Sequence, residues 1–228
     1  MLALLVLVAV LSTAFCSIAN RINHKGKDIF LNGINVAWGI APAFCADVNY
    51  LDPTCSSYDC TKDSAYFEQM FAEIQQNGGN SVRWWLHGDG NAVPVINSNY
   101  SDRIVDSITS TQINSIKLVL ELGSKYGILV NLCIWSFDMV NDNGYGPAYG
   151  LWNKIVTDDT HKDSYINNWL KPLVSSVKDH NNLLSFEVFN EPEGMIDKWG
   201  WTNCQAGSID CAKVSISQAQ RFANHMVE

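Results

Sequence analysis

Positive charge is scarce in this chain. Its 228 residues include 15 Lys and Arg against 23 Asp and Glu, which gives a formal net charge of −8 at pH 7. Proteins that bind nucleic acid carry a basic surface for the phosphate backbone, and binding to anionic lipid needs a cluster of Lys and Arg. We therefore expect neither a nucleic-acid partner nor a membrane surface as a partner of the mature chain.

The motifs of the common cofactor sites are also missing. There is no CxxC pair, and none of the five His residues stands at ligand spacing from two cysteines, which argues against zinc. The segment DMVNDNGYG at 138–146 lacks the spacing of a calcium-binding EF-hand loop. No glycine-rich phosphate loop follows the first expected strand, which argues against a dinucleotide site. We expect no metal and no organic cofactor.

Long apolar runs are absent except at the N-terminus, where residues 2–11 read LALLVLVAVL. This run is shorter than the ~20 residues that span a bilayer. Small residues follow it, as in a secretory signal peptide, although no Lys or Arg precedes it. We predict a signal peptide over residues 1–19, a secreted protein and one domain over 20–228; an uncleaved membrane anchor is the alternative.

Secretion would permit disulfides among the seven cysteines. Cys133 lies inside the apolar run GILVNLCIW and is expected to be a buried free thiol. Cys204 and Cys211 form the most natural local bridge. The pairing of the remaining loop cysteines stays open, because six cysteines allow 15 pairings.

Strand-like and helix-like segments alternate along the chain. Apolar patterns predict strands over 29–38, 81–86, 128–135 and 183–189, and helices over 63–77, 111–126, 163–179 and 215–228. Pro172 should bend or break the third helix. Such alternation implies parallel strands in an α/β fold, which a doubly wound sheet and a (β/α)8 barrel both share.

The loops after the strands favour the barrel. They are long, polar and rich in aromatic residues, and in a barrel such loops build the active face. Four β/α units are half of a barrel, and complete barrels run to ~250 residues. We therefore expect an N-terminal part of a (β/α)8 TIM barrel with only about its first four units present.

The segment Phe189-Asn190-Glu191-Pro192 ends the fourth expected strand. A carboxylic acid at the mouth of a hydrophobic strand is partly desolvated, which favours its protonated form and suits a general acid. Asn190 could orient a substrate hydroxyl group, and Pro192 ends the strand. The simplest alternative is a turn with an incidental Glu.

The second expected strand carries a charged residue among aromatic ones, in VRWWLH at 82–87. Because side chains alternate along a strand, Arg83, Trp85 and His87 should share one face. An inward Arg83 needs a carboxylate partner, since burying a lone Arg is costly. Glu187 is the candidate, and we expect it to be a purely structural partner because it lies a full strand repeat deeper than Glu191, whereas we expect a mixed role for Arg83.

Three segments together, NGINVAWG, GGNSVRWWLHGDG and FEVFNEPEG, resemble glycoside hydrolase family five, and within it the secreted β-mannanases of invertebrate animals. The resemblance runs from about Phe30 onward. It implies a TIM barrel that hydrolyses β-1,4 bonds of mannan, galactomannan or glucomannan with retention. It also implies that Glu191 is the general acid/base, that Asn190 and His87 contact the substrate, and that Arg83 lies beneath the catalytic pair.

Retaining hydrolysis needs a second carboxylate as nucleophile. In the family this is a Glu at the end of the seventh strand, so the resemblance places it beyond residue 228. Trp135 closes its strand just before a polar loop, and we expect it to be a platform on which a sugar ring stacks. Two alternatives remain, an endo-β-1,4-glucanase on the same fold and a non-catalytic carbohydrate-binding barrel.

Overall fold

The computed structural model describes residues 22–36, 64–86, 94–97, 103–141, 151–197 and 214–228. Two compact units divide the chain, Met1–Asn32 and Gly33–Glu228. In the first unit, β1 (Ile22–His24) and β2 (Lys27–Ile29) form an antiparallel hairpin. Lys25 and Gly26 both have positive φ, as a tight two-residue hairpin turn requires.

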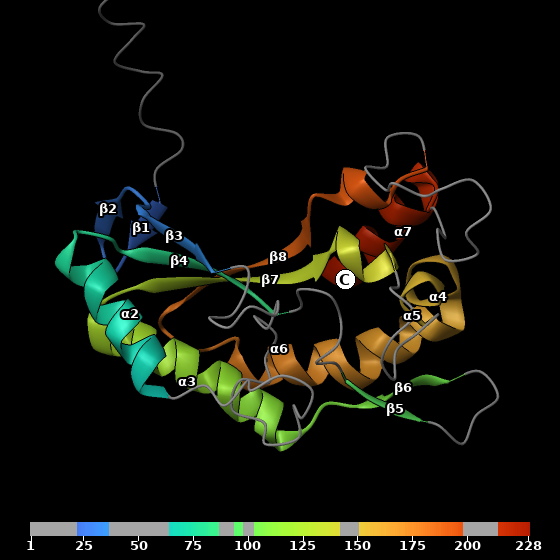
Figure 1. Cartoon of the computed structure of the whole chain (residues 1–228), viewed down its shortest axis with the longest axis horizontal. Helices are drawn as coiled ribbons and strands as arrows, with labels where there is room; N and C mark the ends of the chain where they lie inside the picture. Colours follow the sequence, from blue (N-terminus) through green and yellow to red (C-terminus); the bar gives the residue numbers. More distant parts are fainter. Residues whose placement is uncertain (1–21, 37–63, 87–93, 98–102, 142–150, 198–213) are drawn as a thin grey trace, which may run out of the picture. The chain divides into compact units, whose positions relative to one another are not determined.

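The second unit is built on a parallel sheet (Figure 1). Its strands are β3 (Gly33–Val36), β4 (Ser81–Trp85), β7 (Leu129–Ser136) and β8 (Leu183–Asn190), in the spatial order β3-β4-β7-β8. Each strand therefore pairs with the next parallel strand along the chain. A doubly wound sheet reverses this order at its switch point, whereas a barrel does not. The order confirms an α/β fold and matches one side of a (β/α)8 barrel.

A helix follows each strand, and the helices after β3 and β4 lie along one face of this sheet (Figure 1). The first two are α2 (Ser64–Gln76) and α3 (Ser110–Tyr126), each within one residue of its predicted bounds. Thr109 begins α3 with a capping box, and Gly127 ends it at φ 67°, a conformation that glycine adopts without strain. The last helix, α7 (Ile216–Val227), follows β8 and begins with a second capping box at Ser215.

The third helical segment is irregular where proline enters it. It runs as α5 (Asp159–Tyr165), a π-helical turn η2 (Ile166–Leu170) and α6 (Lys171–Val177). Pro172 has no amide hydrogen to donate, so it sits in the first turn of α6. We predicted a bend or a break at Pro172; the helical path does not break there, and a π turn precedes the proline.

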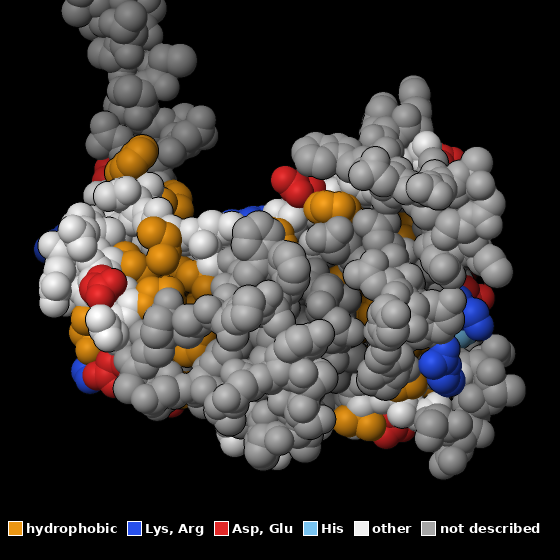
Figure 2. All heavy atoms as spheres, viewed as in Figure 1, with side chains coloured by type: hydrophobic (Ala, Val, Ile, Leu, Met, Phe, Trp, Pro, Cys, Tyr) orange, Lys and Arg blue, Asp and Glu red, His pale blue; other side chains and the backbone are white. Residues whose placement is uncertain are grey.

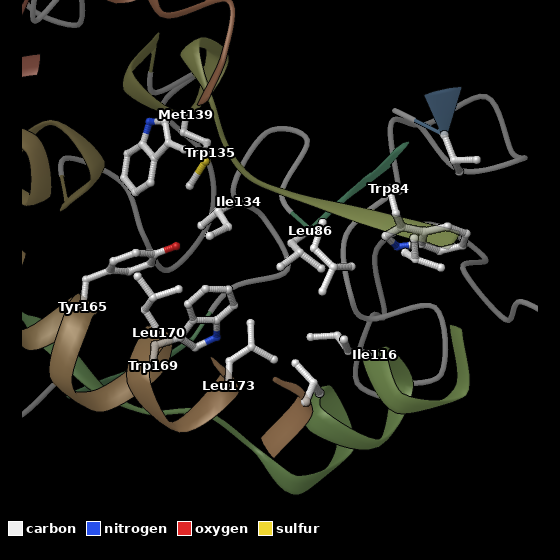
Figure 3. Close-up of a cluster of buried hydrophobic side chains, with 14 of the residues drawn as sticks. Trp84, Leu86, Ile116, Ile134, Trp135, Met139, Tyr165, Trp169, Leu170 and Leu173 are labelled. Atoms are coloured by element: carbon white, nitrogen blue, oxygen red, sulfur yellow. The ribbon is translucent and has the colours of Figure 1, made fainter. Parts of the chain in front are cut away.

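The core lies between the sheet and the helices. Trp84 of β4 contacts Phe67 of α2, with ring centroids 5.1 Å apart. Farther along, Leu86 and Ile134 face Leu173 and other side chains of the helical layer (Figure 3). Because this apolar layer covers one face of the sheet, polar side chains lie on the opposite face.

Several short elements were not predicted. β5 (Val95–Asn97) and β6 (Ile104–Ser107) form an antiparallel hairpin, α4 (Leu151–Thr157) precedes α5, and the 3-10 turns η1 (Phe137–Asn141) and η3 (Pro192–Met195) follow β7 and β8. The hydroxyl oxygen of Ser164 in α5 accepts a hydrogen bond from the amide of Val105 over 3.1 Å, which ties the hairpin to the helices. Among the described helices none combines the length and apolarity needed to cross a membrane.

Candidate active site

A hydrogen-bonded network of polar side chains crosses the sheet on the face opposite the helical core. Its members come from all four strands: Asn35 from β3, Arg83 from β4, Asn131 from β7 and Glu187 from β8. The register aligns Asn35 with Arg83 and Arg83 with Asn131. In a barrel this face points inward, so the network would line the barrel interior.

Arg83 and Glu187 form the centre of this network. We predicted this pair because burying an Arg side chain without a carboxylate partner costs free energy. Arg83 Nε donates to Glu187 Oε2 over 2.8 Å, and Nη2 forms an ion pair with Oε1. The hydrogen bond from Arg83 lowers the pKa of Glu187, and the same bond raises the pKa of Arg83. Asn131 Nδ2 donates to Oε2 as well, at 2.8 Å. Both groups therefore remain ionised at neutral pH.

Asn190 joins the network at the end of β8. Arg83 Nη2 donates to its side-chain oxygen over 3.0 Å. Because a guanidinium only donates hydrogen bonds, this contact assigns the oxygen to the Arg83 side and leaves the amide NH₂ as a donor. That nitrogen is buried and has no partner among the described residues. Asn190 thus offers an oriented donor, as a residue that binds a sugar hydroxyl oxygen should.

Glu191 follows directly in a strained conformation. Its φ of 47° and ψ of 55° place it in the left-handed region, which costs a non-glycine residue about 1–3 kcal/mol and is typical of functional turns. Pro192 then starts η3, and the amide of Gly194 donates to the carbonyl oxygen of Glu191 over 2.9 Å. The polypeptide thus holds Glu191 at the carboxyl end of β8.

One expectation for Glu191 is wrong in this structure. We predicted a partly desolvated carboxyl group at the mouth of a hydrophobic strand, but the residue is exposed. The physical reason is its position: β8 is an edge strand of the described sheet, and Glu191 lies beyond its last residue. The described residues position Glu191 without covering it.

Trp85 and Cys133 complete this face of the sheet. Trp85 Nε1 donates to Asn35 Oδ1 over 3.1 Å, and the Arg83 guanidinium lies 5.3 Å from the centre of the Trp85 ring. Cys133 is buried and free, as predicted. Burial raises the pKa of its thiol to about 12, so the thiol stays protonated beside Glu187. These residues fill space around Arg83.

Trp135 is not the sugar platform that we predicted. Its side chain is fully buried within the apolar cluster drawn in Figure 3. Its ring makes edge contacts with Trp152 of α4, Tyr165 of α5 and Phe222 of α7, at centroid distances of 5.4, 5.5 and 4.9 Å. Three helices therefore cover the ring, and its hydrophobic surface stabilises the core.

Some predicted features lie outside the described residues: His87, the signal segment over 1–19, and the Cys204–Cys211 pair. Sequence reasoning also missed Asn35 and Asn131. The signal was present for Asn131, because a single amide inside the apolar run LVNLCIW needs a polar partner. Within the described part of the chain, no group of three His, Cys, Asp or Glu side chains could hold a metal ion.

The charged side chains of the described residues are scattered over the face shown in Figure 2. On the face shown in Figure 2, Lys and Arg side chains of the described residues lie in small separate groups. No continuous basic patch is visible among the coloured atoms of that face.

The fold and site define a class of protein. Parallel strands in sequential order, a polar interior face and a carboxylate beyond the fourth strand are the features of a (β/α) barrel with its site at the carboxyl ends of the strands. Residues 49–225 match the model of the cellulase family, glycosyl hydrolase family 5. The chain belongs to that family.

Named relatives agree with this assignment. The chain is 32% identical over 177 residues to a mannan endo-1,4-beta-mannosidase of Mytilus edulis, covering 77% of this chain and 43% of the relative. It is 27% identical over 197 residues to the enzyme of the same name from Cryptopygus antarcticus, covering 84% and 47%. The chain thus spans less than half the length of these curated relatives.

A solved structure shows the same fold. The X-ray structure of the β-mannanase from the blue mussel Mytilus edulis matches with a TM-score of 0.67 at 27% identity. The match covers 90% of this chain and 56% of the mussel chain. Most of this chain therefore has a fold similar to that of the mussel β-mannanase.

Proposed function

We propose that this chain is part of a secreted endo-β-1,4-mannanase that cleaves mannan, galactomannan or glucomannan with retention. The observation that carries the proposal is the arrangement at the end of β8: a strained Glu191 next to Asn190, whose amide is oriented by Arg83. The names of the two curated relatives support mannan as the substrate. We also propose that residues 1–19 are a cleaved signal peptide.

In this mechanism Glu191 acts first as the acid. It protonates the glycosidic oxygen while a second carboxylate attacks the anomeric carbon and forms a covalent glycosyl-enzyme. Glu191, now ionised, then removes a proton from the water that hydrolyses this intermediate.

The same proposal assigns the nucleophile to a later strand of the barrel. Retention requires the two carboxyl groups to lie about 5–5.5 Å apart. Glu187 cannot take this role, because Arg83 and Asn131 already hold both of its oxygens. We propose that the four described strands are one side of a (β/α)8 barrel, and that the nucleophile belongs to the other side.

Glucan is the second candidate substrate, because the family model that matches the chain is described as cellulase. Mannose and glucose differ in the direction of the 2-hydroxyl group, so a few contacts decide between them. The test compares initial rates on galactomannan and carboxymethyl-cellulose, with protein expressed from the complete coding sequence. Faster cleavage of galactomannan is expected. Faster cleavage of the glucan would overturn the choice of mannan, and binding without cleavage of either would favour a carbohydrate-binding protein.

A further inference from the structure

The carboxylate of Glu187 is held unusually firmly for a group that the proposed reaction does not consume. Both of its oxygens accept from Arg83, through Nε to Oε2 and through Nη2 to Oε1. Asn131 adds a third donor at Oε2, over 2.8 Å. Ser185 in turn donates to Asn131 Oδ1 over 2.8 Å, which fixes the direction of the Asn131 amide. The bidentate pair therefore has one preferred geometry.

The same guanidinium nitrogen serves two oxygen acceptors, and it also lies 3.6 Å from Cys133 Sγ. Arg83 Nη2 contacts Glu187 Oε1 and also donates to Asn190 Oδ1 over 3.0 Å. A carboxylate that fixes the position of Nη2 therefore also fixes the donor that orients the Asn190 amide. Asn35 accepts from Nη1 over 3.0 Å and limits rotation of the guanidinium from the other side.

We propose that Glu187 is a positioning residue for the glycosidase reaction, acting through Arg83 on the amide of Asn190. The inference rests on the proposed function, in which Asn190 contacts the sugar and the adjacent Glu191 is the acid/base. Without the carboxylate, Arg83 loses its bidentate partner and its Nη2 is free to leave Asn190. The Asn190 amide can then rotate, and its NH₂ group no longer meets the sugar in one fixed direction.

The competing explanation is that Glu187 only neutralises a half-buried Arg. That role predicts a loss of stability that is independent of Asn190. The positioning role predicts that the effects of Glu187 and Asn190 on catalysis are coupled. A double-mutant cycle separates the two, because residues that act as one unit give strongly non-additive losses.

The experiment uses protein from the complete coding sequence and measures kcat and KM on a mannan oligosaccharide. The variants are Glu187→Gln, Asn190→Ala and the double variant. Glu187→Gln should lower kcat about 10- to 100-fold, the range for losing a charged hydrogen bond, with a smaller change in KM. The double variant should be no slower than Asn190→Ala alone, within about twofold.

The matched control is Glu68→Gln. Glu68 is also paired with a cation, Lys125, but on the helical layer, where it accepts from Tyr126 as well. Glu68→Gln should leave kcat unchanged. Combined with Asn190→Ala, it should give the kcat of Asn190→Ala alone. If Glu187→Gln does not fold, Asn131→Ala takes its place, because it removes one donor to Glu187 and keeps the Arg83 pair. It should lower kcat less, with the same coupling to Asn190.

Two failures are distinguishable. If the native protein cleaves neither mannan nor glucan, the proposed function falls and the positioning role falls with it. If the native protein is active but Glu187→Gln keeps the native kcat, or the losses multiply in the double variant, only the positioning role is overturned.

Discussion

The turn that carries Glu191 leaves no room for a side chain at Gly194. A Cβ atom there would lie 2.5 Å from two ring atoms of Phe137 and 3.0 Å from the Phe137 Cβ. Carbon atoms in favourable contact lie about 3.5–4.0 Å apart. In Gly194→Ala, either the ring or the turn must therefore move by about 1 Å.

Such a movement should reach Glu191. The Gly194 amide donates to the Glu191 carbonyl oxygen, and Gly194 lies in the four-residue turn η3 that starts directly after Glu191. A displacement of about 1 Å at a catalytic group costs on the order of 100-fold in rate. We therefore expect kcat on galactomannan to fall about 100-fold in Gly194→Ala, with a stability loss of about 1–3 kcal/mol from the close contact.

The assay compares initial rates for the native protein, Gly194→Ala, Phe137→Ala and the double variant. Removing the ring eliminates both 2.5 Å contacts, so the double variant should be faster than Gly194→Ala. Gly78→Ala is the control: it is strained at φ 80° but meets no atom within 4 Å, so it should lose stability and keep kcat. The reasoning is refuted if Gly194→Ala keeps the native kcat, or if Phe137→Ala restores nothing.

Three further predictions concern the core and the polar network. Trp135→Ala should lower the free energy of unfolding by about 3–5 kcal/mol in chemical denaturation, because three aromatic neighbours lose their contact; a loss below about 1 kcal/mol would contradict its place in the core. Cys133, with a thiol pKa of about 12, should resist iodoacetamide at about pH 8 in the folded protein and react once it is unfolded, as peptide mass spectrometry would show. Labelling at equal rates in both states would argue against this burial. The pKa of Glu187 is lower when folded than when unfolded, so its contribution to stability is complete above the unfolded value of about 4.3 and is lost as the pH falls through the lower folded value. Thermal midpoints of Glu187→Gln should therefore fall less steeply with acid than those of the native protein, and parallel curves would contradict the ion pair.

The sheet could be predicted because its strands carry strong local signals. The run from Leu129 to Ser136 is almost wholly apolar, and Gly127 marks the helix end before it. The strands β5 and β6 escaped prediction because three or four residues are too few to establish an alternating pattern. The π turn before Pro172 is a tertiary adjustment that no local pattern specifies.

The site was predictable where burying a charged side chain without a partner would cost free energy. An inward Arg83 requires a carboxylate partner, and in the structure that partner is Glu187 on β8. Trp135 was mispredicted because an aromatic residue at a strand end can face either sugar or core. The deciding contact, Phe222, comes from a helix far along the chain. The exposure of Glu191 likewise depends on which elements adjoin β8.

The most direct test of the account is Glu191→Gln in protein expressed from the complete coding sequence. Gln has nearly the same shape but cannot donate a proton as an acid, so turnover of galactomannan should fall by a factor of about 100 or more while binding of the polysaccharide persists. Glu193→Gln is the matched control in the same turn and should keep its turnover. Near-native turnover in Glu191→Gln would contradict the acid/base assignment on which the proposed function rests.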